Sequence, residues 1–525
     1  MTDRGRLLAI FACACLVGLP WGTSIAQDVG QRTPVSDPRN ATAVVARVGP
    51  ITITAREYLL AYEFGPGFVK REENSRARFL NLLINEKLLA LGARERGAES
   101  TDQINEFVGE VEGDLATEEL YKRDVLPAVK VSEHEGSGGG KRARNHLQIG
   151  WLFFPEKEGA RSRASAVRTV AQFDSAFDTQ SPDSSSRTDH TLQTTLFRCY
   201  RETPDLASVV DTLTAGHVSS PVHGPDGWYV VKIMNRWKDV ITTESQDAKE
   251  QGDVRSVLEQ QRADSASDQY VRRMMESQTP AIRRPAFDEV ASIMASRALT
   301  VDERKKMQFD SHRVPGDRDD REQDTLVTMH GGIFRISEYM QWYRGREYNI
   351  RFSKRSREGF TSSVEQMVWR MVRDRLLMAR AVRRNLHSLP AVVDQRKWWE
   401  EKALYEFEKE TLASGIHMTD SLLESYYEQH SREFVDSLGG VRPFSFVKDD
   451  VARLAHESAL TAKMLRRVLE LKRKYPVAIM NDVLSKLPVD DEHQPKAIDL
   501  YVGKNGGTFP RPAFPTIDVL WRTWE

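Results

Sequence analysis

The sequence predicts an α+β protein with two tandem, mostly helical modules, the first of which carries an inserted βα domain. Two observations predict the modules. A pattern of two short strands followed by a long amphipathic helix occurs twice, and both copies end in a further helix. A third observation predicts the insertion: in the first copy, the glycine-rich stretch 136–144 leads into a segment that begins and ends with strand-like sequence.

The two copies begin with similar sequences. The first opens AVVARVGPITITAREYLLAY and the second DTLVTMHGGIFRISEYMQWY, and each reads as a strand, a glycine turn, a strand and a helix start. Amphipathic helices follow at 82–97 and 366–385, and a terminal helix at 270–287 corresponds to one at 464–480. Apolar stripes at this spacing form helix cores in most proteins, so we assign them no chemistry.

The repeat and the composition changes between its parts predict the domain boundaries. In the second copy, residues 434–440 form only a turn at the place where the first copy holds its insert. The predicted segments are a signal peptide (1–26), the first part of the first module (27–135), the insert (143–238), a helical return of the first module (239–295), a second module without an insert (325–487) and an arm rich in proline and aromatic residues (488–525).

The N-terminus has the pattern of a targeting segment. Two arginines precede an apolar stretch, and Ser24-Ile25-Ala26 offers a small-residue cleavage site. This pattern predicts export, to a bacterial periplasm. An uncleaved anchor is one alternative and a lipoprotein is another, because Cys13 and Cys15 lie in the apolar stretch. Cleavage after Ala26 would leave Cys199 as the single cysteine, and no disulfide could then form within the chain.

Composition and motifs exclude several classes of function. Lys and Arg number 75 against 76 Asp and Glu, so no net field attracts nucleic acid. Beyond the N-terminus, no stretch approaches the ~20 apolar residues of a membrane span. The sequence contains no glycine-rich phosphate loop, no Gly-x-Ser-x-Gly motif and no paired Cys or His spacing for a metal. We therefore expect no cofactor and no metal.

A stretch of the insert, PDLASVVDTLTAGHVSSPVHGPDGWYVVKI (204–233), resembles the C-terminal third of a parvulin-type (PpiC) peptidyl-prolyl isomerase. The matching positions fall in register without gaps: Pro204, Leu213, Gly216, Val218, Ser219, Pro221, Val222 and Gly227. The helical frame, with its Asn-Glu-Lys-Leu-Leu helix, is similar to the helical part of SurA-like periplasmic chaperones. Together the two resemblances cover residues 44–487.

The resemblance implies a catalytic set that this chain has largely lost. The barrier to rotation about an X–Pro bond is ~18–20 kcal/mol, and parvulins lower it with two histidines and a Cys or Asp. Tyr229 stands at the second histidine position, and a phenol with a pKa near ~10 does not exchange protons freely at neutral pH. The first histidine position is His146 in one alignment and Trp151 in another. Asp183 can stand for the Cys or Asp.

The substrate pocket that the resemblance implies is also altered. Leu206 takes the place of the pocket phenylalanine, and Glu202 falls where a Met or Leu is usual. A carboxylate at that position would disfavour a proline ring. The glycines of the family's tight loop are replaced as well, and the chain reads Asp-His-Thr-Leu-Gln at 189–193.

Two functions remain as hypotheses. The first is an exported folding factor that holds unfolded polypeptides in a helical cradle and uses the parvulin-like insert as a binding platform. The second is an active peptidyl-prolyl isomerase in which Tyr229 replaces a histidine. Both predict unfolded or nascent exported polypeptides as partners. A weaker third interpretation is a scaffold in an envelope complex.

Overall fold

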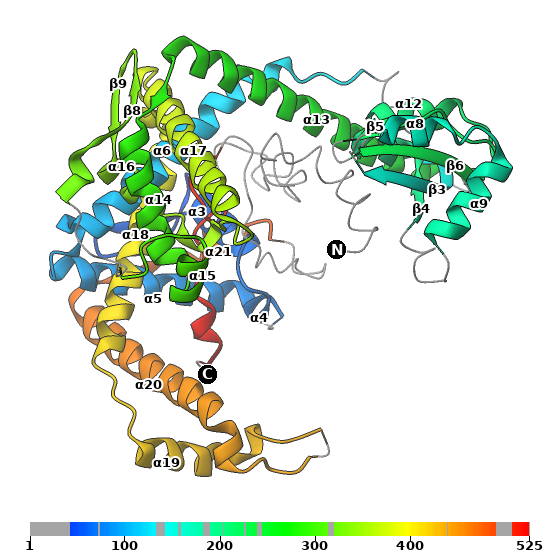
Figure 1. The fold of residues 1–525 in the computed structure, drawn as a ribbon. Helices are drawn as coiled ribbons and strands as arrows, with labels where there is room; N and C mark the ends of the chain where they lie inside the picture. Colours follow the sequence, from blue (N-terminus) through cyan, green and yellow to red (C-terminus); the bar gives the residue numbers. More distant parts are fainter. Residues whose placement is uncertain are drawn as a thin grey trace. The chain divides into compact units, whose positions relative to one another are not determined.

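The computed structural model describes residues 42–71, 74–132, 142–155, 159–181, 190–202, 204–224, 227–238, 244–312, 320–437, 439–489 and 507–523 (Figure 1). The predicted signal peptide lies outside these ranges. The described chain is mostly helical with small antiparallel sheets, which confirms the α+β class. None of the described helices is long and apolar enough to cross a membrane. The chain divides into two compact units, one of which contains residues 121–277 while the other contains 24–120 and 278–525.

The first unit contains a four-stranded antiparallel sheet in the order β4-β3-β6-β5. Its strands are β3 (Asn145–Pro155), β4 (Thr191–Thr195), β5 (Val222–Gly224) and β6 (Gly227–Lys238). The long central pair β3–β6 places Phe153 opposite Tyr229 and His146 opposite Trp237. A Cβ on Gly150 in β3 would come within 2.3 Å of the Met234 methyl group, so the end of that side chain packs over the glycine.

Helices cover both faces of this sheet, and each face has its own apolar cluster. Helices α8 (Ala160–Ser165) and α9 (Val170–Gln180) pack on the face that carries Leu152 and Val230. Helices α11 (Leu196–Glu202) and α12 (Pro204–Thr212) pack on the face that carries Trp151 and Tyr229. Thr169 begins α9 with a capping box that it forms with Gln172. The alternation of side chains along β3 and β6 therefore supplies two separate cores.

Two helices of the first unit bring the chain before the insert close to the chain after it. The end of α6 (Asp102–Asp124) packs on α13 (Glu244–Gln278) through Tyr121 and Ala263. The Tyr270 hydroxyl lies 2.9 Å from an Asp124 carboxylate oxygen, and Arg255 donates to the Val131 carbonyl at 3.4 Å. These contacts do not involve the sheet.

In the second unit, the same succession of strands and helices occurs twice along the chain. The first copy consists of β1 (Val44–Val48), β2 (Ile51–Thr54), α3 (Ala55–Glu63), α4 (Gly67–Lys70), α5 (Ser75–Glu95), η2 (Ala98–Ser100) and α6. The second consists of β8 (Thr325–Met329), β9 (Gly332–Arg335), α16 (Ile336–Arg344), η5 (Glu347–Asn349), α17 (Arg357–Arg383), η6 (Leu386–Ser388) and α18 (Pro390–Ser414). Each copy is thus a hairpin, a short helix and two long helices (Figure 1).

Each hairpin gains a third strand, and that strand comes from the chain that follows the other copy. Strand β10 (Val477–Ile479) pairs with β1 in the sheet β10-β1-β2, although β10 lies near the end of the second copy. Strand β7 (Ala281–Ile282) follows the first copy and pairs with β8 in the sheet β7-β8-β9. The two copies therefore exchange their third strands.

The long helices are exchanged in the same way. Helix α5 packs against α18 and against α20 (Phe444–Lys474), and their buried side chains form one large cluster that includes Leu88, Leu404 and Met464. Helix α17 packs on α14 (Arg284–Ala298) and lies close to α6, where a Cβ on Gly113 would come within 1.9 Å of Met378. The first long helix of one copy, α5 or α17, thus packs mainly on helices that belong to the other copy or follow it in the chain.

The end of the second copy forms a smaller lobe. Helix α19 (Asp420–His430) packs on the beginning of α20 around Leu423, Phe434 and Val447. Between the two helices the chain reverses direction: the Asp436 N–H donates to the Gly440 carbonyl at 2.8 Å. Gly439 has a φ of 81°, which glycine adopts without strain. We call residues 420–455 the α19–α20 lobe.

The helical parts are expected to fold without the insert. If residues 137–238 are replaced by a short glycine linker, the contacts between α6 and α13 and the whole second unit remain. We expect far-UV circular dichroism with increased fractional helix and a single cooperative thermal transition. Loss of cooperative unfolding would contradict the predicted boundaries of the insert.

Candidate functional site

The structure brings three of the predicted site residues together on one face of the insert sheet. Trp151, Leu206 and Tyr229 are buried in the cluster beneath α11 and α12. The Tyr229 ring lies 5.0 Å from that of Phe153, its partner across the β3–β6 pair. This face is apolar, and Cys199 is buried in the same cluster. Such a surface favours packing against apolar groups over proton transfer.

His146 lies away from these residues. It pairs with Trp237 near the other end of the β3–β6 ladder, and its ring stacks on that tryptophan at 5.4 Å. Trp151 lies only two residues along β3 from the partner of Tyr229, so the strand register favours Trp151 over His146 as the neighbour of Tyr229. Asp183 lies outside the described residues. Glu202 is the last residue of α11, and the structure does not describe its side chain.

A different histidine of the insert is buried beside Trp151. His190 is 2% exposed, and its Nδ1 lies 3.1 Å from the Trp151 carbonyl. In return, the Trp151 N–H donates to the His190 carbonyl at 3.1 Å. The imidazole also lies 6.3 Å from the Phe177 ring. These bonds extend the pairing of β3 with β4, and the sequence alone offered no signal that this loop histidine would be buried.

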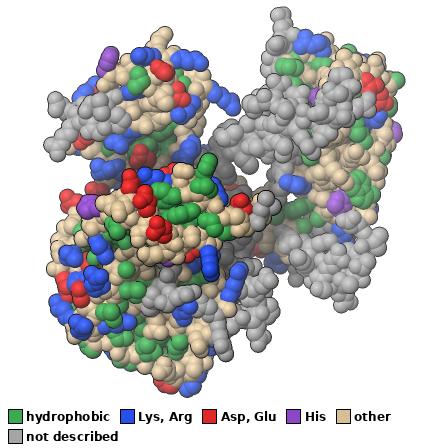
Figure 2. Space-filling model, turned by 90° about the horizontal axis from the view of Figure 1, so that it is seen from below, with side chains coloured by type: hydrophobic (Ala, Val, Ile, Leu, Met, Phe, Trp, Pro, Cys, Tyr) green, Lys and Arg blue, Asp and Glu red, His purple; other side chains and the backbone are tan. Residues whose placement is uncertain are grey.

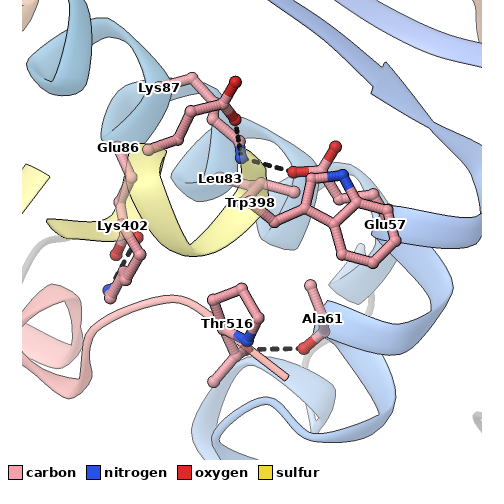
Figure 3. Close-up of a pocket in the computed structure, with 10 residues that line it drawn as sticks. Glu57, Ala61, Leu83, Glu86, Lys87, Trp398, Lys402 and Thr516 are labelled. Carbon is pink, nitrogen blue, oxygen red and sulfur yellow. Dashed lines mark hydrogen bonds and ion pairs between the residues drawn. The ribbon is translucent and has the colours of Figure 1, made fainter. Parts of the chain in front are cut away.

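The second unit contains a buried ion cluster at a pocket (Figure 3). Lys87 on α5 forms ion pairs with Glu57 on α3 and, at 2.6 Å, with Glu401 on α18, and all three side chains are at most 6% exposed. The pocket is small, with room for about one water molecule, and its lining includes Trp398 and Pro515. One cation between two buried carboxylates leaves one negative charge uncompensated within this triad.

The charges of the triad shift the pKa values of its members. Burial raises the pKa of Glu57 to about 7, although the Lys87 ammonium acts in the opposite direction. Burial by itself would lower the pKa of Lys87, but Glu401 and Glu57 outweigh it and raise that pKa above its usual range. Near neutral pH, Glu57 therefore exchanges a proton while Lys87 stays charged.

A second set of buried charges binds the last part of the C-terminal arm, residues 515–523, to the helices. One Glu86 oxygen accepts from the Asp518 N–H at 2.6 Å and from the Trp521 indole at 3.0 Å. Asp518 accepts from the Tyr405 hydroxyl at 3.0 Å and from Lys409 at 2.6 Å. Burial raises the pKa of Asp518, but Lys402, Lys409 and hydrogen bonds outweigh burial and hold it at about 2. Trp521 is fully buried in the core, so this part of the arm belongs to the fold.

The arm segment before this anchor, residues 507–514, also lies against the helices. Asp114 on α6 accepts from the backbone N–H groups of Thr508, at 2.5 Å, and Phe509, at 3.0 Å. Arg346, just after α16, donates to the Thr508 carbonyl at 2.7 Å. Arg511 pairs with Asp114 at 2.7 Å. The prolines and aromatic residues of the arm predict an extended segment that either packs on the frame or offers a partner motif, and residues 507–514 pack on the helical frame.

The apolar periodicity of the repeat helices predicts core without chemistry, and that prediction does not include these buried charges. One signal was present: Glu86 and Lys87 interrupt an otherwise apolar helix face. In the second copy, Asp374 and Arg375 occupy the corresponding positions, and Arg375 pairs with Glu110 on α6 at 2.8 Å. Within the described ranges, no group of three His, Cys, Asp or Glu side chains could hold a metal ion.

Comparisons with known proteins assign the chain to no family. No protein-family model matches it, and no curated protein does. Among solved structures, it is similar to the foldase protein PrsA from Streptococcus pneumoniae str. Canada MDR_19A, with a TM-score of 0.19 and 11% sequence identity. That match covers 41% of this chain and 85% of the PrsA chain.

Tyr229→Phe tests what the phenol contributes to the insert. Because Tyr229 is packed among apolar side chains, we expect the variant to lose only ~0.5–1.5 kcal/mol of unfolding free energy, the contribution of one hydrogen bond. Its rate in a protease-coupled proline-peptide assay should equal that of the wild type. A rate at least tenfold lower, equivalent to ~1.4 kcal/mol of transition-state stabilisation, would instead identify Tyr229 as catalytic.

Glu57→Gln tests the proton on the buried triad. Because the folded-state pKa of Glu57 is about 7 against an ordinary 4.5, the folded protein binds more protons than the unfolded chain between these values. The stability that this proton contributes is present at low pH and is lost as pH rises through about 7. In urea unfolding, we expect the wild-type free energy minus that of the variant to fall by ~1–3 kcal/mol between pH 5 and pH 8. A difference that does not change with pH would contradict the assignment.

Proposed function

We propose that this chain is an exported folding factor that holds unfolded polypeptides. In this proposal the two helical modules form a SurA-like frame, and the parvulin-like insert serves as a binding platform. The observation that carries the proposal is a group of exposed apolar side chains on the α19–α20 lobe. They are Leu422, Val435, Val441 and Phe446, of which Phe446 is 75% exposed.

This group fits a surface that binds unfolded chains. Its four members come from α19, the turn and the beginning of α20, which pack together around one small core. Val435 and Val441 are paired across the turn, and exposed apolar side chains that lie close together are typical of protein–protein contact sites. On the face seen in Figure 2, apolar patches lie among basic and acidic side chains, and no large area carries charge of one sign. Such a surface suits varied polypeptides better than nucleic acid.

The positions of the insert that the parvulin resemblance singled out favour a structural role over catalysis. Trp151 and Tyr229 are buried beneath α11 and α12, so their rings are part of the insert's core, and His146 is stacked on Trp237 near the other end of the strand pair. Side chains packed in this way hold the sheet together and do not exchange protons with a bound polypeptide. The alternative, an active isomerase, is favoured by one observation, the burial of His190 beside Trp151.

A test of the holding function replaces the exposed apolar side chains of the lobe. The double variant Leu422→Asp, Phe446→Asp changes two exposed positions, so the fold should be retained. We expect at least three times more protein to be needed for half-suppression of aggregation of a heat-unfolded client, measured by light scattering. Tyr348→Asp is the matched control, because Tyr348 is 89% exposed but lies outside the lobe.

The control should suppress aggregation as well as the wild type. A folded double variant that also equals the wild type would refute the proposed role of the lobe. A wild type that suppresses no aggregation would refute the holding function as a whole.

A further inference from the structure

Residues 507–516 of the C-terminal arm lie as an extended segment between α6 and the chain after α16, a place that we call the groove. The sequence of this segment is GTFPRPAFPT, which carries three prolines, two phenylalanines and one arginine. No helix or strand is formed between residues 507 and 518, so the segment is held by contacts with the helices and not by secondary structure of its own. Thr508 and Arg511 are nonetheless at most 3% exposed.

The groove binds the backbone of this segment from both sides. Asp114 accepts from two successive N–H groups, those of Thr508 and Phe509. Arg346 donates to the Thr508 carbonyl through Nε at 3.1 Å and Nη2 at 2.7 Å. Arg346 is itself held by Glu110, at 2.8 Å. Every polypeptide offers backbone N–H and C=O groups, so these contacts do not depend on the occupant's sequence.

Two side chains of the segment are also recognised. The Phe509 ring lies against Phe107, with ring centroids 5.9 Å apart, and the Arg346 guanidinium lies 5.1 Å from the same ring. Arg511 pairs with Asp114 and, at 2.7 Å, with Glu118 on the next turn of α6. The groove therefore selects an aromatic residue followed, two positions later, by a basic one.

A small pocket borders the end of this segment. The pocket of Figure 3 is lined by Pro515 and Thr516 and, on its other sides, by Trp398, Leu83 and the buried triad. The contacts of Asp518 and Trp521 with Glu86 do not involve residues 507–514, so displacement of that segment would leave them in place.

We propose that this groove, formed by α6, α18 and the chain after α16, is a binding site for extended client segments that contain an aromatic residue followed by a basic one. The chain's own residues 507–514 occupy the site as an internal competitor, which a client segment displaces. The inference rests on the proposed holding function and identifies a site for it. A tethered segment competes at a high effective concentration, so a free peptide binds well only when the tethered one is weakened.

The test uses the full chain and a fluorescein-labelled peptide, GTFPRPAFPT. Phe509→Ala with Arg511→Ala weakens the internal segment and leaves Asp114, Glu118 and Arg346 unchanged. We expect this arm variant to bind the peptide at least tenfold more tightly than the wild type in fluorescence anisotropy. The gain should disappear when Asp114→Asn is added. A peptide with alanine in place of its first phenylalanine and its arginine should bind the arm variant at least tenfold more weakly.

A second measurement needs no variant. In the wild type, the backbone amides of Thr508 and Phe509 should exchange hydrogen at least tenfold faster when a reduced, carboxymethylated model protein is present at saturation. The amide of Asp518, which belongs to the anchor, should keep its protection. A folded arm variant whose peptide affinity lies within twofold of the wild type would overturn the inference. Unchanged exchange at Thr508 and Phe509 would overturn it too.

These outcomes are separate from those of the proposed function. Suppression of aggregation by the wild type together with no peptide binding to the arm variant would leave the holding function in place and refute the groove. Peptide binding to the arm variant without any suppression of aggregation would support the groove as a peptide site and refute the holding function.

Discussion

The exchange of third strands between the two copies is the constraint on which the second unit depends. Strand β10 completes the hairpin of β1 and β2, and β7 completes that of β8 and β9. A two-stranded hairpin is at best marginally stable in water, so each copy needs the strand that follows the other. The same exchange brings α18 and α20 against α5 and joins residues more than 300 positions apart in one core. The copies therefore form a single folding unit in spite of their internal similarity.

The buried charges follow from this packing. Lys87, Glu57 and Glu401 come from three helices that meet only after the exchange, and their burial carries a large desolvation cost unless each is paired. One ammonium group cannot neutralise two carboxylates. A proton on Glu57 neutralises the remaining negative charge, in agreement with the raised pKa of Glu57. Glu86 instead bonds to the arm at Asp518 and Trp521. Helix α5 therefore binds the second copy through Lys87 and the C-terminal arm through Glu86.

The insert is stabilised by apolar clusters of its own, separate from the core of the second unit. Its sheet is covered on both faces by its own helices and has two apolar clusters of its own. The resemblance to parvulins singled out Trp151, Leu206 and Tyr229 as site positions, and the structure places these three in one apolar cluster. Only the register of β3 on β6 separated His146 from them, because the two alignments differ by five residues along one strand. The burial of His190 depends on how its loop packs on Trp151, and no local pattern encodes that.

Local patterns predicted the two hairpins and the long helix that follows each, because turn glycines and apolar periodicity depend only on near neighbours. The same patterns wrongly continued the terminal helices of 270–287 and 464–480 through the strands β7 and β10, whose pairing depends on distant hairpins. The sequence also showed charged residues inside an apolar helix face, at Glu86 and Lys87. Only the tertiary structure decided which return strand pairs with which hairpin, which carboxylates meet Lys87 and where the arm lies. The reason is physical: the two copies present nearly the same hairpin pattern, so a short strand such as Val477–Ile479 matches either hairpin equally well by local criteria. The choice between them is made by the packing of α5, α18 and α20, and that packing exists only in the folded chain.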